Sequence, residues 1–130
     1  MTARRARRER DDGSAVVEFV VVVPVLLLVV LAVVQIGLAL HVRATLASAA
    51  AEGARVAAVS GGDGAAGVRR TREILATTVA DGVVESVTAR EVVIGSLAAV
   101  DVEVDARLPL VGLLGPEALV VHGHALVEAG

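Results

Sequence analysis

A long apolar segment preceded by a single carboxylate is the feature that most constrains how this chain can fold. From Phe19 to Leu40 the only non-apolar side chain is Gln35, and Glu18 stands directly in front of the run. A helix of this length spans about 33 Å, which is enough to cross the hydrocarbon core of a bilayer. A carboxylate costs roughly 2.5–3.5 kcal/mol at the membrane centre and less at its edge, so Glu18 is expected to have a partner.

Basic residues at the two ends of the segment predict its orientation. Five arginines precede it, at positions 4, 5, 7, 8 and 10, whereas only Arg43 and Arg55 follow it closely. Because basic flanks stay in the cytoplasm, we expect a cytoplasmic N-terminus and an exported C-terminal part. A cleavable secretory signal is the alternative, since Ala47-Ser48-Ala49 resembles a small-residue cleavage site. The apolar run, however, is longer than the about 7–15 residues of a signal peptide.

Composition limits what the rest of the chain can do. The 130 residues allow one membrane segment and one small domain. The chain has no Cys, Trp or Tyr, so it has no disulfide framework and no tryptophan or tyrosine on which bases could stack. The net charge of −3 argues against a nucleic-acid partner.

The residues after the membrane segment predict that the helix continues and is followed by a second, shorter helix. Residues 43–59 are rich in alanine and lack proline, so the first helix is expected to run from about Ala15 to Val59. Glycines at positions 61, 62, 64 and 67 then provide a break. Beyond them, Val68, Leu75 and Val79 share one helical stripe, which indicates an amphipathic helix.

Strand patterns complete the expected fold. Residues 83–94 are rich in β-branched side chains, residues 100–108 alternate strictly between apolar and charged, and residues 118–127 can form a last strand after a turn at 113–116. The expected fold class is α+β: a long membrane-spanning helix that continues into a small exported domain with a short helix and about three antiparallel strands. The apolar face of the sheet needs a cover, which the two helices can provide.

The start of the apolar segment also carries a resemblance to a known family. The sequence Gly13-Ser14-Ala15-Val16-Val17-Glu18-Phe19, then Pro24, Val34-Gln35-Ile36-Gly37 and the stretch from Ala50 to Ala58, resembles the TadE-like family. These are small pilin-like proteins of tight-adherence (Flp-type) pilus systems. The residues that carry the resemblance cover about one third of the chain, and the chain departs from the family where Gln35 replaces a frequent glutamate.

The resemblance implies processing by a membrane prepilin peptidase that cuts after Gly13. Ser14 then becomes the new N-terminus, about one helical turn from Glu18. Glu18, with Phe19 beside it, is expected to pair with this amine in the same or in an adjacent subunit and to fix the register between subunits. The implied division is a basic cytoplasmic leader 1–13, a transmembrane helix 14–42, its extracytoplasmic extension 43–59 and an exported domain 60–130.

Four residues of the long helix are expected to serve helix packing: Pro24, Gln35, Gly37 and Gly53. Pro24 either kinks the helix for a function or is absorbed by local adjustment. Gln35 bonds a neighbouring helix or its own backbone. Gly53 belongs to a stretch of small residues that lets other backbones approach, either in a partner or in the chain's own domain.

The remaining polar groups favour solvated surfaces over sites. His122 and His124 share one strand face, but no third metal ligand is evident from the sequence, so we expect no metal site and no cofactor. The acidic row of Asp101, Glu103 and Asp105 is likewise expected to face solvent. No phosphate loop, nucleophile elbow or zinc-binding helix is present, which argues against an enzyme.

The expected function is that of a minor pseudopilin or pilus-assembly protein in the cytoplasmic membrane, with a prepilin peptidase, other pilins or assembly proteins and the lipid bilayer as partners. The first alternative is an uncleaved single-pass anchor whose exported domain binds a ligand or envelope partner. The second is a secreted enzyme released by cleavage near Ala49.

Overall fold

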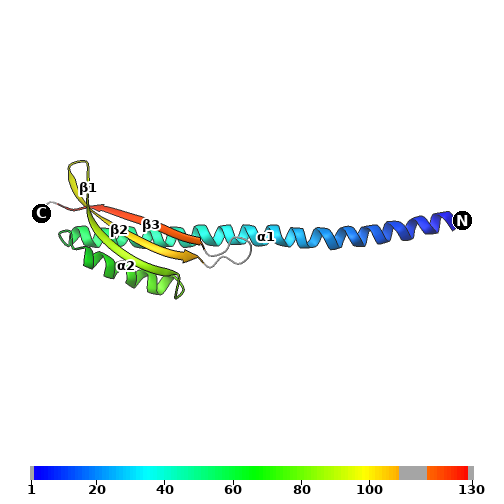
Figure 1. Ribbon diagram of the computed structural model, residues 1–130, viewed down its shortest axis with the longest axis horizontal. Coiled ribbons are helices and arrows are strands. Elements are labelled where there is room, and N and C mark those ends of the chain that lie inside the picture. Colours follow the sequence, from blue (N-terminus) through cyan, green and yellow to red (C-terminus); the bar gives the residue numbers. More distant parts are fainter. Residues whose placement is uncertain (1, 109–116, 129–130) are drawn as a thin grey trace. The chain divides into compact units, whose positions relative to one another are not determined.

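The computed structural model describes residues 2–108 and 117–128, with the side chains of residues 11–108 and 118–128. Its elements are, in order, α1 (Thr2–Val59), α2 (Gly64–Thr78), β1 (Val84–Ile94), β2 (Leu97–Leu108) and β3 (Glu117–Leu126) (Figure 1). They fall into two compact units, Met1–Gly37 and Leu38–Gly130. A long apolar helix, a short helix and a three-stranded antiparallel sheet confirm the expected α+β class.

The N-terminal unit is a stretch of α1 whose apolar side chains are open to the surroundings. Between Val16 and Ile36 its large apolar side chains are 47–69% exposed, except for the half-buried Val23. Among the described residues, α1 is the one helix long and apolar enough to cross a membrane. It begins at Thr2, earlier than the expected start near Ala15, because alanine, arginine and glutamate before Ala15 are good helix formers and no proline interrupts them.

The C-terminal unit contains the sheet, in which β2 lies between β1 and β3 and pairs antiparallel with both. The strict alternation expected over 100–108 is confirmed, because Val100, Val102 and Val104 are fully buried on one face. A register shift between Val84 and Ser86 inserts an irregularity at the start of β1.

The C-terminal part of α1 and the whole of α2 cover the apolar face of the sheet, as the sequence predicted (Figure 1). Leu46, Ala50 and Ala54 of α1 are fully buried in the resulting core. Their small side chains bring the helix close to the sheet. At Gly123 of β3 the approach is closest, because a Cβ there would overlap the backbone of α1 at Ala50 and Ala51.

The two helices also pack against each other. A Cβ on Gly53 of α1 would overlap Thr71 Oγ1 of α2, and a Cβ on Gly67 would lie 2.8 Å from the Gly53 carbonyl oxygen. Gly67 therefore serves this contact, whereas the glycine pattern of the sequence predicts a place for it in the break between the helices. Thr71 is fully buried, and its hydroxyl donates to the Gly67 carbonyl at 2.9 Å.

The break itself is shorter than expected. Gly61 and Gly62 have φ angles of 75° and 93°, which favour glycine, and they end α1 after Val59. Asp63 then caps α2, because its side chain accepts a hydrogen bond from the backbone N–H of Ala65 at 3.0 Å. The turn predicted at 113–116 lies outside the described residues.

Candidate functional site

The residues of the predicted cleavage and pairing site lie on an accessible stretch of α1. Gly13, Ser14 and Glu18 are exposed, and Phe19 is 69% exposed. Nothing approaches within 4 Å of the position that a Cβ on Gly13 would occupy. Within the described side chains, Glu18 makes no ion pair or hydrogen bond. The predicted roles of these residues stay predictions, and the site is open to a partner.

The residues predicted to serve helix packing differ in their surroundings. Pro24 lies inside α1, which continues through it as a helix. Gln35 is half-buried, and Gly37 is open, with nothing within 4 Å of a Cβ there. Gly53, in contrast, is buried against α2 inside the C-terminal unit. The structure thus assigns Gly53 to packing within its own domain, whereas the packing roles of the other three stay predictions.

The face of the sheet opposite the helices carries a cluster of acidic, basic and histidine side chains. β2 contributes Asp101 and Glu103, and β3 contributes His122 and His124, which stand directly opposite them in the register. β1 contributes Arg90, which stands opposite Asp101. Five polar side chains from three strands therefore meet on one surface, which we call the outer-face cluster.

Asp101 lies at the centre of this cluster. Its Oδ2 accepts a hydrogen bond from Arg90 Nε at 2.9 Å, and its Oδ1 lies 3.3 Å from His122 Nδ1 and 3.0 Å from His124 Nδ1. Its side chain is only 4% exposed. The expectation that the acidic row is solvated is therefore wrong for Asp101, because neighbouring long side chains on both flanking strands cover it.

The other members of the cluster are more open and connect to the same centre. Glu103 Oε2 lies 3.1 Å from Arg90 Nη2 and 3.7 Å from His122 Nδ1. The rings of His122 and His124 stack nearly parallel, with their centroids 6.1 Å apart. Arg90 is 61% exposed, and His124 is 52% exposed. Solvent, ions or a partner can reach the cluster from this side.

The sequence predicted which of these residues share a face within one strand, but it did not predict that the two strands bring them together. His122 and His124 were recognised as sharing a strand face, and so were Asp101 and Glu103. No third ligand is evident beside the histidines in the sequence, but in the structure one oxygen or nitrogen atom each of Asp101, Glu103 and His122 lies within 4.8 Å of the other two. The missing information was the register of β2 against β3, which the alternation within each strand does not contain.

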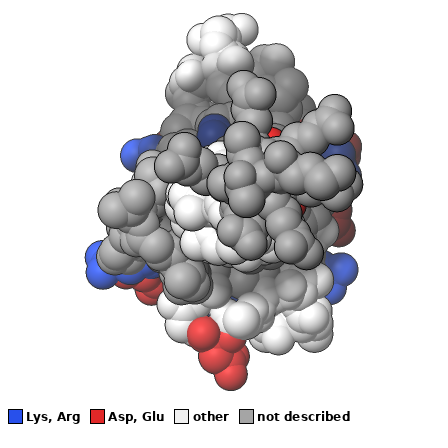
Figure 2. Space-filling model, turned by 90° about the vertical axis from the view of Figure 1, so that its right-hand side faces the viewer, with Lys and Arg blue, Asp and Glu red and all other residues white. Residues whose placement is uncertain are grey.

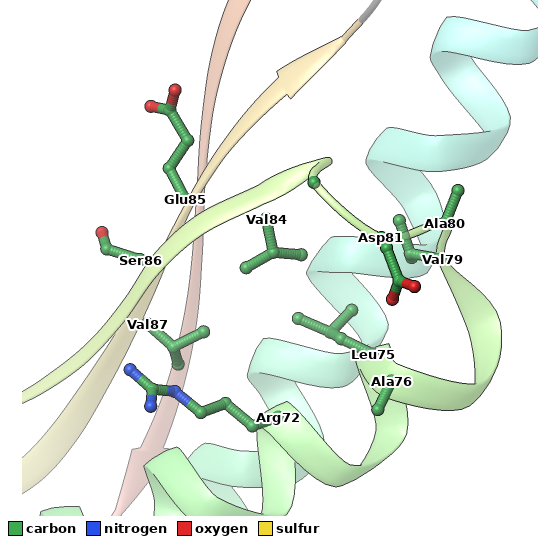
Figure 3. Close-up of a pocket in the computed structure, with 11 residues that line it drawn as sticks. Arg72, Leu75, Ala76, Val79, Ala80, Asp81, Val84, Glu85, Ser86 and Val87 are labelled. Atoms are coloured by element: carbon green, nitrogen blue, oxygen red, sulfur yellow. The ribbon is translucent and has the colours of Figure 1, made fainter.

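A groove between α2 and β1 is one of several concave features of the C-terminal unit, with a volume of about 360 Å³. Leu75 of α2 points toward Val84 and Val87 of β1 across it, and Arg72 extends beneath Val87 (Figure 3). Ser86 points away from the groove, and its hydroxyl donates to Asp105 on the outer face at 2.6 Å. The groove is therefore a seam between two packed elements, and charged residues such as Arg72, Asp81 and Glu85 line it together with the apolar ones.

Charged side chains do not gather by sign on the face shown in Figure 2. Among the described residues visible there, Arg and Asp/Glu side chains both lie around the margin, with uncharged surface between them. A nucleic-acid interface needs a continuous basic surface. The described part of this face does not supply one.

Comparison with known proteins bears on residues 13–55, one third of the chain. A family model described as "TadE-like protein" matches residues 13–55. No curated protein and no solved structure gives a match. The matched residues include the predicted cleavage site, the whole apolar segment and the start of the buried small-residue stretch that ends at Ala58. The family resemblance of this chain is thereby confirmed over residues 13–55.

Proposed function

We propose that this protein is a minor pseudopilin or pilus-assembly protein of a type IV-like, tight-adherence pilus. In this proposal it is made with a basic leader, and a membrane prepilin peptidase removes the leader by cutting after Gly13. The observation that carries the proposal is the family match, which starts at Gly13 and leaves residues 1–12 outside. A match that begins beside the predicted cut supports a leader that is not part of the assembled protein.

The surroundings of the apolar segment support this function. An exposed row of large apolar side chains from Val16 to Ile36 needs lipid or other subunits to cover it. In a subunit that is stored in the bilayer and then moves into an assembly, lipid covers this apolar surface first and other subunits cover it afterwards. In the proposed topology, the N-terminus lies in the cytoplasm and the sheet domain lies outside the cytoplasmic membrane, because the five leader arginines favour retention.

Glu18 has a specific role in this proposal. Cleavage creates an ammonium group at Ser14, about one helical turn before the Glu18 carboxylate. The Glu18 side chain is exposed and unpaired within the described side chains, so it can pair with the Ser14 amine of a neighbouring subunit. A charge pair of this kind within an apolar assembly fixes the axial register more than it stabilises the assembly.

The mature N-terminus, determined by mass spectrometry of the protein from membranes that contain its peptidase, tests the proposal. We expect a chain that begins at Ser14. Gly13→Leu should block the cut, because the peptidase must approach the backbone closely at this residue. Gly37→Leu is the matched control, since both glycines lie in α1 and no atom of the chain lies within 4 Å of a Cβ at either position.

Two other N-termini of the wild-type protein would contradict the proposal, and the processing of the variant tests the role of Gly13 separately. An intact leader in the presence of the active peptidase would identify a plain membrane anchor. A start near Ala50 would identify a secreted protein. Normal processing of Gly13→Leu would show that the cut does not depend on Gly13, although a start at Ser14 in the wild type would still support the pilin function.

A further inference from the structure

The outer-face cluster places four side chains of metal-ligating types at the corners of a small rectangle. Asp101 and Glu103 are two residues apart on β2, and His124 and His122 stand opposite them on β3. Residues two apart on a strand point to the same face, and directly opposed residues have Cβ atoms about 4.5–5.5 Å apart. The rectangle therefore has two carboxylates on one side and two imidazoles on the other.

The distances between donor atoms fit a small divalent ion. In a tetrahedral zinc site with bonds of about 2.0–2.1 Å, neighbouring ligand atoms lie about 3.3 Å apart. In the cluster, Asp101 Oδ1 lies 3.3 Å from His122 Nδ1 and 3.0 Å from His124 Nδ1, and Glu103 Oε2 lies 3.7 Å from His122 Nδ1. Three of the edges of such a tetrahedron are thus present before any side chain moves.

Arg90 fits the role of a residue that orients the carboxylates. Its guanidinium holds Asp101 through Oδ2, which leaves Oδ1 turned toward the two histidines. It also holds Glu103 at 3.1 Å. Groups that hydrogen-bond ligands in this way set the orientation of those ligands, and their loss typically weakens metal binding about 10–100-fold. Arg90 additionally keeps the two carboxylates from repelling each other when no ion is bound.

We propose that Asp101, Glu103 and His122, completed by His124, form a binding site for Zn²⁺ on the outer face of the sheet. Imidazole nitrogens favour zinc and similar transition metals, whereas calcium needs six to eight oxygen ligands and magnesium prefers oxygen and water. Asp101, Glu103 and His122 already lie close together. His124 contacts Asp101, and its half-exposed side chain can rotate to become the fourth ligand. The bound ion would clamp β2 to β3 on the face that the helices leave uncovered.

Zinc titration of the full-length protein in detergent micelles, purified without a polyhistidine tag, tests this proposal. Isothermal titration calorimetry should show one zinc ion per chain. His122→Gln should weaken zinc binding at least about tenfold, since even groups that only hydrogen-bond a metal ligand contribute this much. His41→Gln is the matched control, because the chain has three histidines and His41 lies outside the cluster. It should leave the affinity unchanged.

Two substitutions of acidic residues distinguish metal ligation from a general effect of surface charge. Glu103→Gln removes a proposed ligand, and Asp105→Asn removes an acid of the same strand and face that instead bonds Ser86. Only the first should weaken zinc binding, with the circular dichroism spectra of both variants unchanged. An equal loss of affinity in these two variants would overturn the zinc site. The site would also be overturned if the His122→Gln/His124→Gln double variant bound zinc as tightly as the wild-type protein does. Tighter binding of Ca²⁺ or Mg²⁺ than of Zn²⁺ would overturn it as well. None of these outcomes bears on cleavage after Gly13.

Discussion

Gly123 of β3 lies against the main chain of α1 at Ala50, and no Cβ fits between them. The contact brings a helix and a strand together at backbone distance in the middle of the core. Ala50 is fully buried there, beside the fully buried Val102, which pairs with Gly123 in the sheet. Because the neighbouring atoms belong to the backbone of a helix, they cannot give way as a flexible side chain would.

Gly123→Ala should therefore destabilise the C-terminal unit. Overpacking of a well-packed core costs typically about 1–3 kcal/mol, and a clash with backbone places this substitution at the upper end. Thermal unfolding followed by circular dichroism measures the effect. Val120→Ala in the same strand is the control, because Val120 is 47% exposed and its truncation leaves the contact with α1 intact. Equal losses in the two variants would contradict the close approach.

The crossing of α1 and α2 gives a second stability prediction. Gly53→Ala places a methyl group against Thr71 Oγ1 and the Gly67 carbonyl, so we expect a loss of about 1–3 kcal/mol. Alanine in an open helix position is instead favoured over glycine by about 1 kcal/mol. Gly37→Ala, in the same helix with nothing nearby, should therefore leave the free energy of unfolding unchanged or raise it. Chemical denaturation in one detergent compares the two variants.

Elements with a strong internal pattern could be predicted from the sequence. The apolar run and the alanine-rich stretch indicated a helix that ends at Val59, and α1 ends there. The alternation from Val100 to Leu108 indicated which side chains of β2 are buried, and all five apolar ones are. In each case one periodicity within one segment determines both the element and its buried face.

Contacts between segments could not be predicted in this way. Thr71 is a polar residue at a fully buried position, and only the approach of Gly53 and Gly67 explains it. The outer-face cluster depends on pairing Asp101 with His124, and a slip of one residue would turn the histidines to the other face. A glycine between two histidines on β3 was a usable signal, since glycine inside a strand often marks a close backbone approach.

Arg90 and Arg107 offer a matched comparison on the outer face. Arg90 bonds the buried Asp101, whereas Arg107 bonds Glu85, which is 47% exposed. Arg90→Ala leaves the buried Asp101 carboxylate without its charged donor, and a loss of this kind lowers the free energy of unfolding by about 1–3 kcal/mol. We expect a value near the lower end, because Arg90 itself is largely exposed. Arg107→Ala breaks an exposed pair and should cost under about 0.5 kcal/mol. Urea unfolding of both variants measures the difference, and an equal cost would show that Asp101 does not depend on Arg90.

The Glu18 carboxylate should matter for assembly and not for the fold. Glu18→Gln keeps the size of the side chain and removes its charge, so the pairing with the Ser14 amine of a neighbouring subunit is lost. We expect the variant to be cleaved and folded normally but to co-purify poorly with other pilus proteins after mild detergent extraction. Glu52→Gln is the control, because Glu52 lies in the same helix and forms only an exposed pair with Arg55 at 3.7 Å. If Glu18→Gln assembled as well as Glu52→Gln, the register role of Glu18 would be wrong, and the exposed apolar surface of α1 would remain as the source of assembly affinity.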